Sequence, residues 1–164
     1  MKKFDSQFIY NGVVFPLEWH EVDDFSEVPR EHASQIYGVC FYNDDIVLVT
    51  SDNKTFNLPG GTIEKGETYD ETFKREIQEE TNMRVVSSKP IGYQIVSKPD
   101  GTKTWQLRVA AKVEKIGDFE SDPGGPVTAI KLCKIEEFNS YIQYGKVGER
   151  LIQRALDALR QNRL

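Results

Sequence analysis

The chain has 164 residues, with 21 Lys and Arg against 26 Asp and Glu, and a formal net charge of −5. Domains usually hold about 100–200 residues, so we expect one domain over residues 1–164. The acidic balance argues against duplex nucleic acid as a partner, because its phosphates bind basic faces. No apolar run approaches the roughly 18 residues of a membrane span, which predicts a cytoplasmic protein without membrane contacts.

Short strands separated by turn residues are predicted in the first third of the chain. They fall at residues 7–10, 13–15, 35–42, 46–50 and 56–58. Asn11 and Gly12, between the first two strands, form the strongest short hairpin signal. Residues 1–30 are therefore expected to include an N-terminal hairpin extension, and residues 21–34 a polar connecting loop.

Helical and strand patterns alternate in the rest of the chain. A helix is predicted over residues 68–81, where Phe73 and Ile77 lie four apart on one face. Further strands are expected at residues 85–86, 91–96, 104–113 and 127–132. A final helix over residues 147–161 carries an apolar stripe that is typical of core packing. Together these patterns predict an α/β fold in which a mixed sheet packs between helices.

Three glutamates of the first predicted helix share one face. Glu76, Glu79 and Glu80 stand at positions i, i+3 and i+4, so their carboxylates are neighbours. Like charges at these spacings destabilise a helix by a few tenths of a kcal/mol per pair. A hard divalent cation such as Mg²⁺, which takes oxygen ligands, would offset that cost. The alternative is an acidic face that is simply solvated.

The residues around these glutamates favour a binding site. Gly60 and Gly61 allow a sharp turn that brings backbone carbonyls near a ligand. Glu67 lies at the start of the helix, where the helix dipole favours a carboxylate, and Arg75 could reach back to pair with it. Asn82 falls at the helix end, where Asn accepts a left-handed conformation. A loop, a carboxylate-lined helix and a second loop are thus expected to form one unit.

Residues 61–83 as a whole resemble the signature box of the Nudix hydrolases. The matching positions are Gly61, Glu67 after five residues and, after seven more, the run Arg75-Glu76-Ile77-Gln78-Glu79-Glu80. The family's box continues with any residue, a glycine and an aliphatic residue, where this chain has Thr81, Asn82 and Met83. Both Gly and Asn tolerate the left-handed conformation, so the departure at residue 82 changes little.

The resemblance implies an α/β/α sandwich, the Nudix fold, and cleavage of a phosphoanhydride that depends on Mg²⁺ or Mn²⁺. The implied substrate is a nucleoside diphosphate linked to another group, such as a nucleoside triphosphate, ADP-ribose or a nucleotide sugar. The implied metal ligands are the Gly61 carbonyl and the carboxylates of Glu76, Glu79 and Glu80. Glu67 and Arg75 would orient the loop and the helix.

The group that takes the proton from the attacking water is left open by the sequence. One choice is a glutamate of the box, such as Glu79. Many members of the family supply another glutamate from a later loop, and the candidates here are Glu120, Glu136, Glu137 and Glu149. Glu120 is favoured because it precedes a Gly-Pro cluster, whereas Glu136 and Glu137 are expected to cap a short turn in solvent.

Three side chains are candidates for substrate binding. Trp105 and Arg108, on a predicted strand after the box, could stack on a base and contact phosphate. Phe56, just before the glycine pair, could also stack on a ligand, although each aromatic side chain could equally belong to the core. Pro99 has a spacing similar to that of the ADP-ribose branch of the family, and it also suits an ordinary hairpin turn.

Two interpretations compete with that of an enzyme. A non-catalytic sensor on the same fold would bind a nucleotide or sugar phosphate, and the loop over residues 120–127 leaves room for it. A protein-interaction domain would use the early hairpin, residues 8–19, as an edge for a homodimer or another partner, because exposed strand edges invite pairing.

Overall fold

The computed structural model describes residues 3–10 and 12–161, with nine strands and three α-helices among them. The strands are β1 (Lys3–Tyr10), β2 (Val13–His20), β3 (Ala33–Tyr42), β4 (Asp45–Thr50), β5 (Phe56–Asn57), β6 (Gly60–Thr62), β7 (Met83–Ser97), β8 (Lys103–Lys115) and β9 (Ala129–Cys133). The helices are α1 (Tyr69–Thr81), α2 (Phe138–Tyr141) and α3 (Gly145–Arg160), with a 3₁₀ turn, η1 (Ile135–Glu137), before α2.

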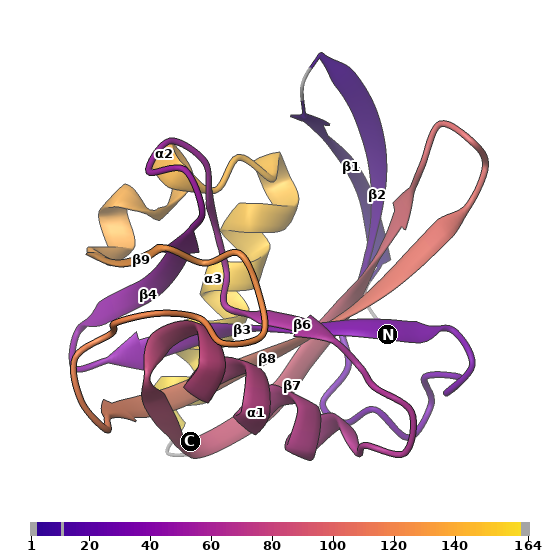
Figure 1. Ribbon diagram of the computed structural model, residues 1–164. Helices are drawn as coiled ribbons and strands as arrows, with labels where there is room; N and C mark the ends of the chain where they lie inside the picture. The colour runs from indigo at the N-terminus through magenta and orange to yellow at the C-terminus, as the bar shows by residue number, and fades with distance from the viewer. Residues whose placement is uncertain (1–2, 11, 162–164) are drawn as a thin grey trace.

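The strands form one mixed sheet in the order β1-β2-β7-β8-β3-β4-β5. β3 and β8 run parallel, with Tyr37 opposite Arg108, while the other pairs of strands are antiparallel. β6 pairs with the first half of β3, and β9 pairs with β4. Figure 1 shows α1 in front of the sheet and α3 behind it, so the expected α/β/α sandwich is confirmed.

Two apolar clusters fill the space between the sheet and the helices. One cluster contains Leu107 and Val109 of β8 and packs with Phe73 and Ile77 of α1. The other includes Ala110 and packs with α3. Because side chains alternate along a strand, Gln106 and Arg108 face the α3 side, whereas Trp105 faces the α1 side. This alternation decides which of the predicted site residues can act together.

The N-terminal hairpin is confirmed, and it is longer than predicted. β1 and β2 pair antiparallel from Lys3 opposite His20 to Tyr10 opposite Val13. Asn11 of the predicted turn lies outside the described residues, and Gly12 has φ +76°. Figure 1 shows this hairpin projecting beyond the body of the sheet.

β7 is one long strand where the sequence predicted two. Pro90 lacks an amide hydrogen, which argues against a continuous strand. Irregularities in the β7–β8 pairing next to Val85 and Pro90 absorb the misfit, and the pairing then continues to Ser97 opposite Lys103. None of the helices within residues 3–10 and 12–161 combines the length and apolar composition needed to cross a bilayer.

Candidate active site

Helix α1 is held at both ends by side-chain hydrogen bonds. At its start, the Thr68 hydroxyl accepts from the Glu71 N–H at 3.2 Å, while the Glu71 carboxylate accepts from the Thr68 N–H at 2.8 Å. At its end, Asn82 has φ 52° and ψ 38°, which confirms the expected left-handed cap. The Asn82 amide donates to the Asp118 carbonyl at 2.8 Å, so the helix end is tied to the loop after β8.

Gly60 and Gly61 bring β6 against both β3 and α1. A Cβ at Gly60, where φ is +142°, would lie 2.1 Å from the Ile36 carbonyl oxygen, so only glycine fits. The Gly60 N–H donates to Glu80 Oε2 at 2.9 Å. A Cβ at Gly61 would lie 2.5 Å from the Glu76 carboxylate. The glycine pair thus lets two of the predicted ligand carboxylates meet the loop backbone.

Arg75 links the loop to the glutamates of α1. Its Nε and Nη2 donate to the two carboxylate oxygens of Glu67 at 2.7 and 3.0 Å, which confirms the predicted pair. Its Nη1 donates to Glu76 Oε1 at 2.9 Å and to Glu79 Oε2 at 3.3 Å. Hydrogen bonding to Arg75 is the main cause that lowers the pKa of Glu67 to about 2, so Glu67 stays ionised.

Burial and like charge make ionisation of two glutamates unfavourable. Burial raises the pKa of Glu80 to about 8; the Gly60 N–H opposes this shift, and the charges of Glu76 and Asp122 add to it. Burial also raises the pKa of Glu76, although Arg75 opposes the effect. Full ionisation of Glu76, Glu79 and Glu80 would therefore give more negative charge than Arg75 compensates.

Asp122 is a member of this cluster that the sequence reasoning missed. Its charge adds to the pKa shifts of both Glu76 and Glu80. Its two carboxylate oxygens accept from the N–H groups of Gly124 and Val127, at 3.1 and 3.2 Å, which fixes the loop. The sequence did carry a signal for this turn, because the Asp side chain at the start of an Asp-Pro-Gly-Gly turn accepts hydrogen bonds from backbone N–H groups that follow it. That pattern does not show which carboxylates the turn will face.

The donor chemistry of this cluster fits a divalent cation. Carboxylate and carbonyl oxygens are the ligands that Mg²⁺ prefers, and a cation would offset the cost of ionising the buried Glu76 and Glu80 carboxyl groups. Across residues 3–10 and 12–161, no three His, Cys, Asp or Glu side chains already stand at metal-ligand spacing. Glu76 and Glu79 instead bind Arg75, and Glu80 binds Gly60. Cation binding would require these carboxylates to turn away from those donors.

Glu120 lies on the exposed loop after β8, beside a cavity of about 540 Å³. Arg75 and Glu79 line the same cavity. The loop itself approaches Glu79, because a Cβ at Gly124 would lie 2.8 Å from Glu79 Oε2. Glu120 therefore faces the same space as the box carboxylates.

The other predicted proton acceptors lie elsewhere. The Glu137 carboxylate accepts from the Lys134 N–H at 3.3 Å, as a cap of η1, and Glu136 is exposed on the same turn. Glu149 is exposed on α3, across the sheet from α1. The structure thus brings only Glu120 of these four to the box.

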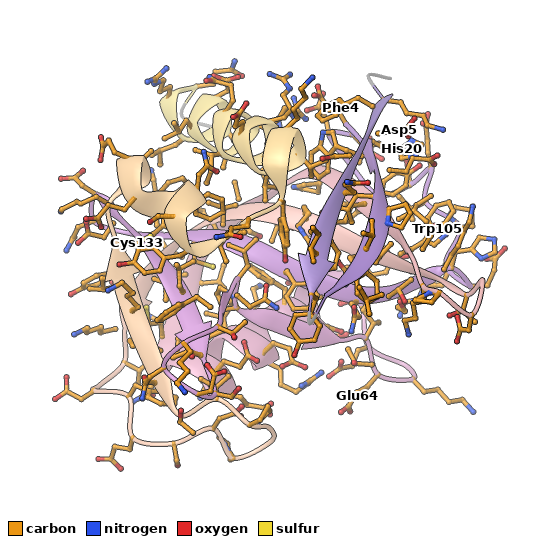
Figure 2. All side chains as sticks on the ribbon, turned by 90° about the horizontal axis from the view of Figure 1, so that it is seen from above. Phe4, Asp5, His20, Glu64, Trp105 and Cys133 are labelled. Carbon is orange, nitrogen blue, oxygen red and sulfur yellow. The ribbon has the colours of Figure 1, made fainter. Side chains whose placement is uncertain are left out.

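The three substrate candidates do not form one group. The Trp105 ring stacks on those of Tyr93 and His32, with centroids 5.1 Å away in both cases. Figure 2 shows Trp105 and His20 on the same side of the molecule, and the His20 ring stacks on the far side of Tyr93. Arg108 lies on the opposite face of β8, so it cannot act with Trp105 on one ligand in the way the sequence suggested.

Arg108 is buried, with its guanidinium carbon 4.9 Å from the centre of the Tyr37 ring. Phe56 lies on the same side of the sheet as Arg108, in edge contact with Tyr141 at 5.1 Å, and it lines a second cavity of about 540 Å³. Of the three substrate candidates, Phe56 lines this cavity, and Arg108 lies buried on the same side of the sheet.

Comparison with known proteins gives matches over most of the chain. The profile of the NUDIX domain matches residues 32–154. A protein of Bacillus subtilis (strain 168) named "Putative 8-oxo-dGTP diphosphatase YtkD" is 30% identical over 105 residues, which are 63% of this chain and 63% of that protein. The chain therefore matches less than two thirds of this relative's length.

Many solved structures share the fold, and two of them serve as examples. A mutant of the Bacillus subtilis pyrophosphohydrolase BsRppH superposes with a TM-score of 0.74 at 18% identity, over 96% of this chain and 98% of that chain. A NUDIX hydrolase from Nitrosomonas europaea gives a TM-score of 0.63 at 17% identity, over 77% and 90% of the two chains. At these identities the likeness concerns the fold.

Proposed function

Because this chain belongs to the NUDIX domain family, we propose that it is a metal-dependent pyrophosphohydrolase. Its substrate would be a nucleoside diphosphate linked to another group through a phosphoanhydride. One observation carries the proposal: Glu76, Glu79 and Glu80 are all present, and they gather with Arg75 against the Gly60–Gly61 turn. A chain that had only kept the fold for binding would be expected to have lost one of these glutamates.

The proposed metal site takes its ligands from β6 and α1. Glu76, Glu79, Glu80 and the Gly61 carbonyl would hold Mg²⁺ or Mn²⁺. When bound, such a cation neutralises phosphate charge and makes a bound water a better nucleophile at neutral pH. Glu67 would keep Arg75 in place, as the two parallel hydrogen bonds between them indicate. Arg75 donates to Glu76 and Glu79, and a cation held by these carboxylates would take its place there.

Two carboxylates remain candidates for accepting the proton of the attacking water. Glu79 lies beside Arg75 at the mouth of the first cavity, and Glu120 stands on the loop that borders it. A general base must come within hydrogen-bond reach of the proton, directly or through one water. Glu79 is held on a rigid helix, whereas Glu120 is exposed on a loop that would have to bring it inward.

Two observations bear on which group is linked to the diphosphate in the proposed substrate. The relative named for 8-oxo-dGTP favours a nucleoside triphosphate. The ADP-ribose alternative rested on Pro99, which lies in the turn between β7 and β8, where the Lys98 N–H donates to the Thr102 carbonyl at 2.8 Å. That geometry supports the hairpin-turn interpretation of Pro99.

A substrate panel tests the proposal. Nucleoside triphosphates, oxidised nucleotides, ADP-ribose, nucleotide sugars and dinucleoside polyphosphates would be incubated with the protein and Mg²⁺ or Mn²⁺, and the products resolved by chromatography. We expect phosphate or pyrophosphate release from at least one class, and none with Glu80→Gln. Binding of a nucleotide or sugar phosphate without any product, across the whole panel, would replace the enzyme with the non-catalytic sensor.

A further inference from the structure

A second cavity of about 540 Å³ lies on the α3 side of the sheet, between the β1–β2 hairpin, β5 and the segment before α3. Its walls are aromatic and include Phe8, Phe56, Tyr141 and Tyr144. Its polar lining includes Asn57 and Gln106, and among the described residues that line it none is Asp or Glu. In a chain with a net charge of −5, this is a cavity without an acidic group.

The amide of Gln106 is held in one orientation. Its Oε1 accepts from Arg108 Nη2 at 2.9 Å and from Gln94 Nε2 at 2.8 Å. A guanidinium can only donate, so the atom that Arg108 contacts must be the amide oxygen. Gln106 Nε2 donates one hydrogen to Gln35 Oε1 at 2.8 Å, which leaves its second N–H for a ligand. Gln106 therefore offers the cavity a donor and no acceptor.

Arg108 has a role beyond this one hydrogen bond. It is 1% exposed, no carboxylate pairs with it in the part of the chain that the structure describes, and its Nε has no hydrogen-bond partner there. A buried charge without a counter-ion is costly. The positive charge of Arg108, in contact with Gln106, favours ligands that present electron-rich hydrogen-bond acceptors to the cavity.

The amide of Asn57, like that of Gln106, is held in one orientation. Its Oδ1 accepts from the Leu58 N–H at 2.8 Å and lies 3.2 Å from the Tyr144 hydroxyl. A backbone N–H can only donate, so the oxygen of the amide is again turned into the protein. The Nδ2 group of Asn57 is left as a donor, and the cavity thus presents two fixed amide donors between aromatic walls.

The lining of the cavity continues along the chain into the turn that meets the candidate metal ligands. Only Leu58 and Pro59 separate Asn57 from Gly60, whose N–H binds Glu80. Across the sheet, Tyr37 contacts Arg108 through its ring, and its backbone lies against Gly60. A ligand whose diphosphate reached the glutamates could therefore place its other end in this cavity.

We propose that this cavity binds the nucleobase of the substrate and selects a 6-oxopurine, with Gln106 and Asn57 donating to its O6 and N7. This inference rests on the proposed function. A 6-oxopurine presents two adjacent acceptors on that edge, whereas adenine presents the N7 acceptor and the N6 donor. Adenine would place its donor against a donor that cannot turn. The aromatic walls supply stacking that any base can use, and Arg108 is a positioning residue that fixes the Gln106 amide.

Comparison of dITP with dATP tests the inference on the unmodified protein, because the two bases differ only at position 6 and the proton on N1. With Mg²⁺ present, we expect kcat/KM for dITP to exceed that for dATP by about 10- to 100-fold, the range of discrimination by a two-bond contact to a base. The difference should lie mainly in KM, since the base is remote from the bond that is cleaved.

Gln106→Glu reverses the hydrogen-bonding character of the cavity with little change of shape. The new carboxylate can still accept from Arg108 and Gln94, and the Gln35 amide can turn to donate to it, so the variant is expected to fold. The change replaces the ligand-facing donor with an acceptor. The preference for dITP should disappear or reverse in favour of dATP. Asn57→Asp makes the same exchange at the second donor and should shift the ratio in the same direction. Gln153→Glu, on the exposed face of α3, adds the same charge elsewhere and should leave the ratio unchanged.

The outcomes separate the inference from the proposed function. Equal kcat/KM for the two nucleotides in the unmodified protein, or an unchanged ratio in both variants, would overturn base selection while the enzyme assignment stands. If no nucleotide is turned over, titration of dITP and dATP binding by calorimetry decides the base preference on its own. Equal binding, or no binding of either nucleotide, would overturn the inference together with the enzyme.

Discussion

Arg75 and Glu67 form a two-bond ion pair in which Nε and Nη2 each donate to one carboxylate oxygen, at 2.7 and 3.0 Å. The pair is partly buried, with 26% of the Arg75 side chain and 21% of the Glu67 side chain exposed. The Thr72 hydroxyl donates to the same carboxylate at 2.7 Å. This geometry holds the loop before α1 to the helix, while Nη1 of the same guanidinium donates to Glu76 and Glu79.

Glu67→Gln should weaken metal binding without unfolding the protein. Glutamine offers one acceptor in place of two and no charge, so Arg75 would bind Glu76 and Glu79 more strongly and compete better with the cation. Loss of a group that orients metal ligands typically costs about 10- to 100-fold in metal affinity or activity. The Mg²⁺ concentration for half-maximal activity should rise within that range, with little change in Tm.

Asp70→Asn is the matched control for this change. Asp70 pairs with Lys74 at 2.7 Å on the exposed face of the same helix, and such pairs contribute about 0.3–0.5 kcal/mol. Its Mg²⁺ dependence should match that of the unmodified protein. Equal Mg²⁺ dependence of Glu67→Gln and the unmodified protein would show that the ion pair does not orient the site.

The stability of the metal-free protein should fall as the pH rises from about 5 to 8. The pKa of the Glu80 carboxyl is about 8 in the folded protein against 4.5 for the free group, because its ionised form is penalised by burial. The unfolded chain releases this proton first, so the stability present below pH 4.5 is lost progressively as the pH approaches 8. Urea unfolding of metal-free protein at several pH values measures the slope.

Glu80→Gln should remove this pH dependence and abolish turnover. Glutamine can still accept from the Gly60 N–H, and it never ionises. Each unit of pKa shift corresponds to about 1.4 kcal/mol, and solvent that reaches the site reduces the effect, so we expect the variant to be about 1–3 kcal/mol more stable than the unmodified protein at pH 8 in the absence of metal. If Glu80→Gln is still less stable at pH 8 than at pH 5, as we expect of the unmodified protein, then a group other than Glu80 causes the loss of stability.

Local patterns made α1 and its ion pair predictable. Three features depend on residues no more than eight positions apart in the chain: the ends of the helix, the left-handed Asn82 and the contact between Glu67 and Arg75. Helix geometry fixes the spacing of such residues. The same holds for the β1–β2 hairpin, which one turn signal defines.

Contacts between distant segments were not predictable in the same way. Which carboxylates Asp122 faces depends on where the loop after β8 returns, and no local pattern encodes that path. The separation of Trp105 from Arg108 depends on strand alternation, which follows from the sequence only once the strand and its two buried faces are known. The fixed amides of Gln106 and Asn57 each need a distant partner as well as a local one: Gln94 of β7 donates to Gln106, and the Tyr144 hydroxyl, from the segment before α3, donates to Asn57.

Gly60→Ala and Gly61→Ala should have different effects although the residues are adjacent. A Cβ at Gly60 meets backbone atoms of β3 at 2.1 and 2.7 Å, and φ is +142°, so alanine should destabilise the protein by at least about 2 kcal/mol. A Cβ at Gly61 meets only the flexible end of Glu76, at 2.5 Å. Thermal unfolding should therefore show a large loss of Tm for Gly60→Ala alone.

The activity of Gly61→Ala completes this comparison. The added methyl group displaces the Glu76 carboxylate from the loop, so metal-dependent turnover should fall at least about 10-fold, the lower range for disturbed metal ligands, while the Tm changes little. Full activity with an unchanged Tm would show that the contact between Gly61 and Glu76 does not position a ligand.

Glu79→Gln and Glu120→Gln test which carboxylate accepts the proton during turnover. Removal of a general base typically lowers the rate by about 10²- to 10⁴-fold. Glu79→Gln should lower kcat by at least that factor, since this residue is proposed as a metal ligand whether or not it is also the base.

Glu120→Gln decides which of the two carboxylates is the base. If Glu120 is the base, kcat falls by a similar factor. The Mg²⁺ dependence is then unchanged, because Glu120 is not among the proposed ligands. Glu149→Gln, on the opposite side of the sheet, serves as the control. A normal kcat for Glu120→Gln would eliminate Glu120 and leave Glu79 as the base.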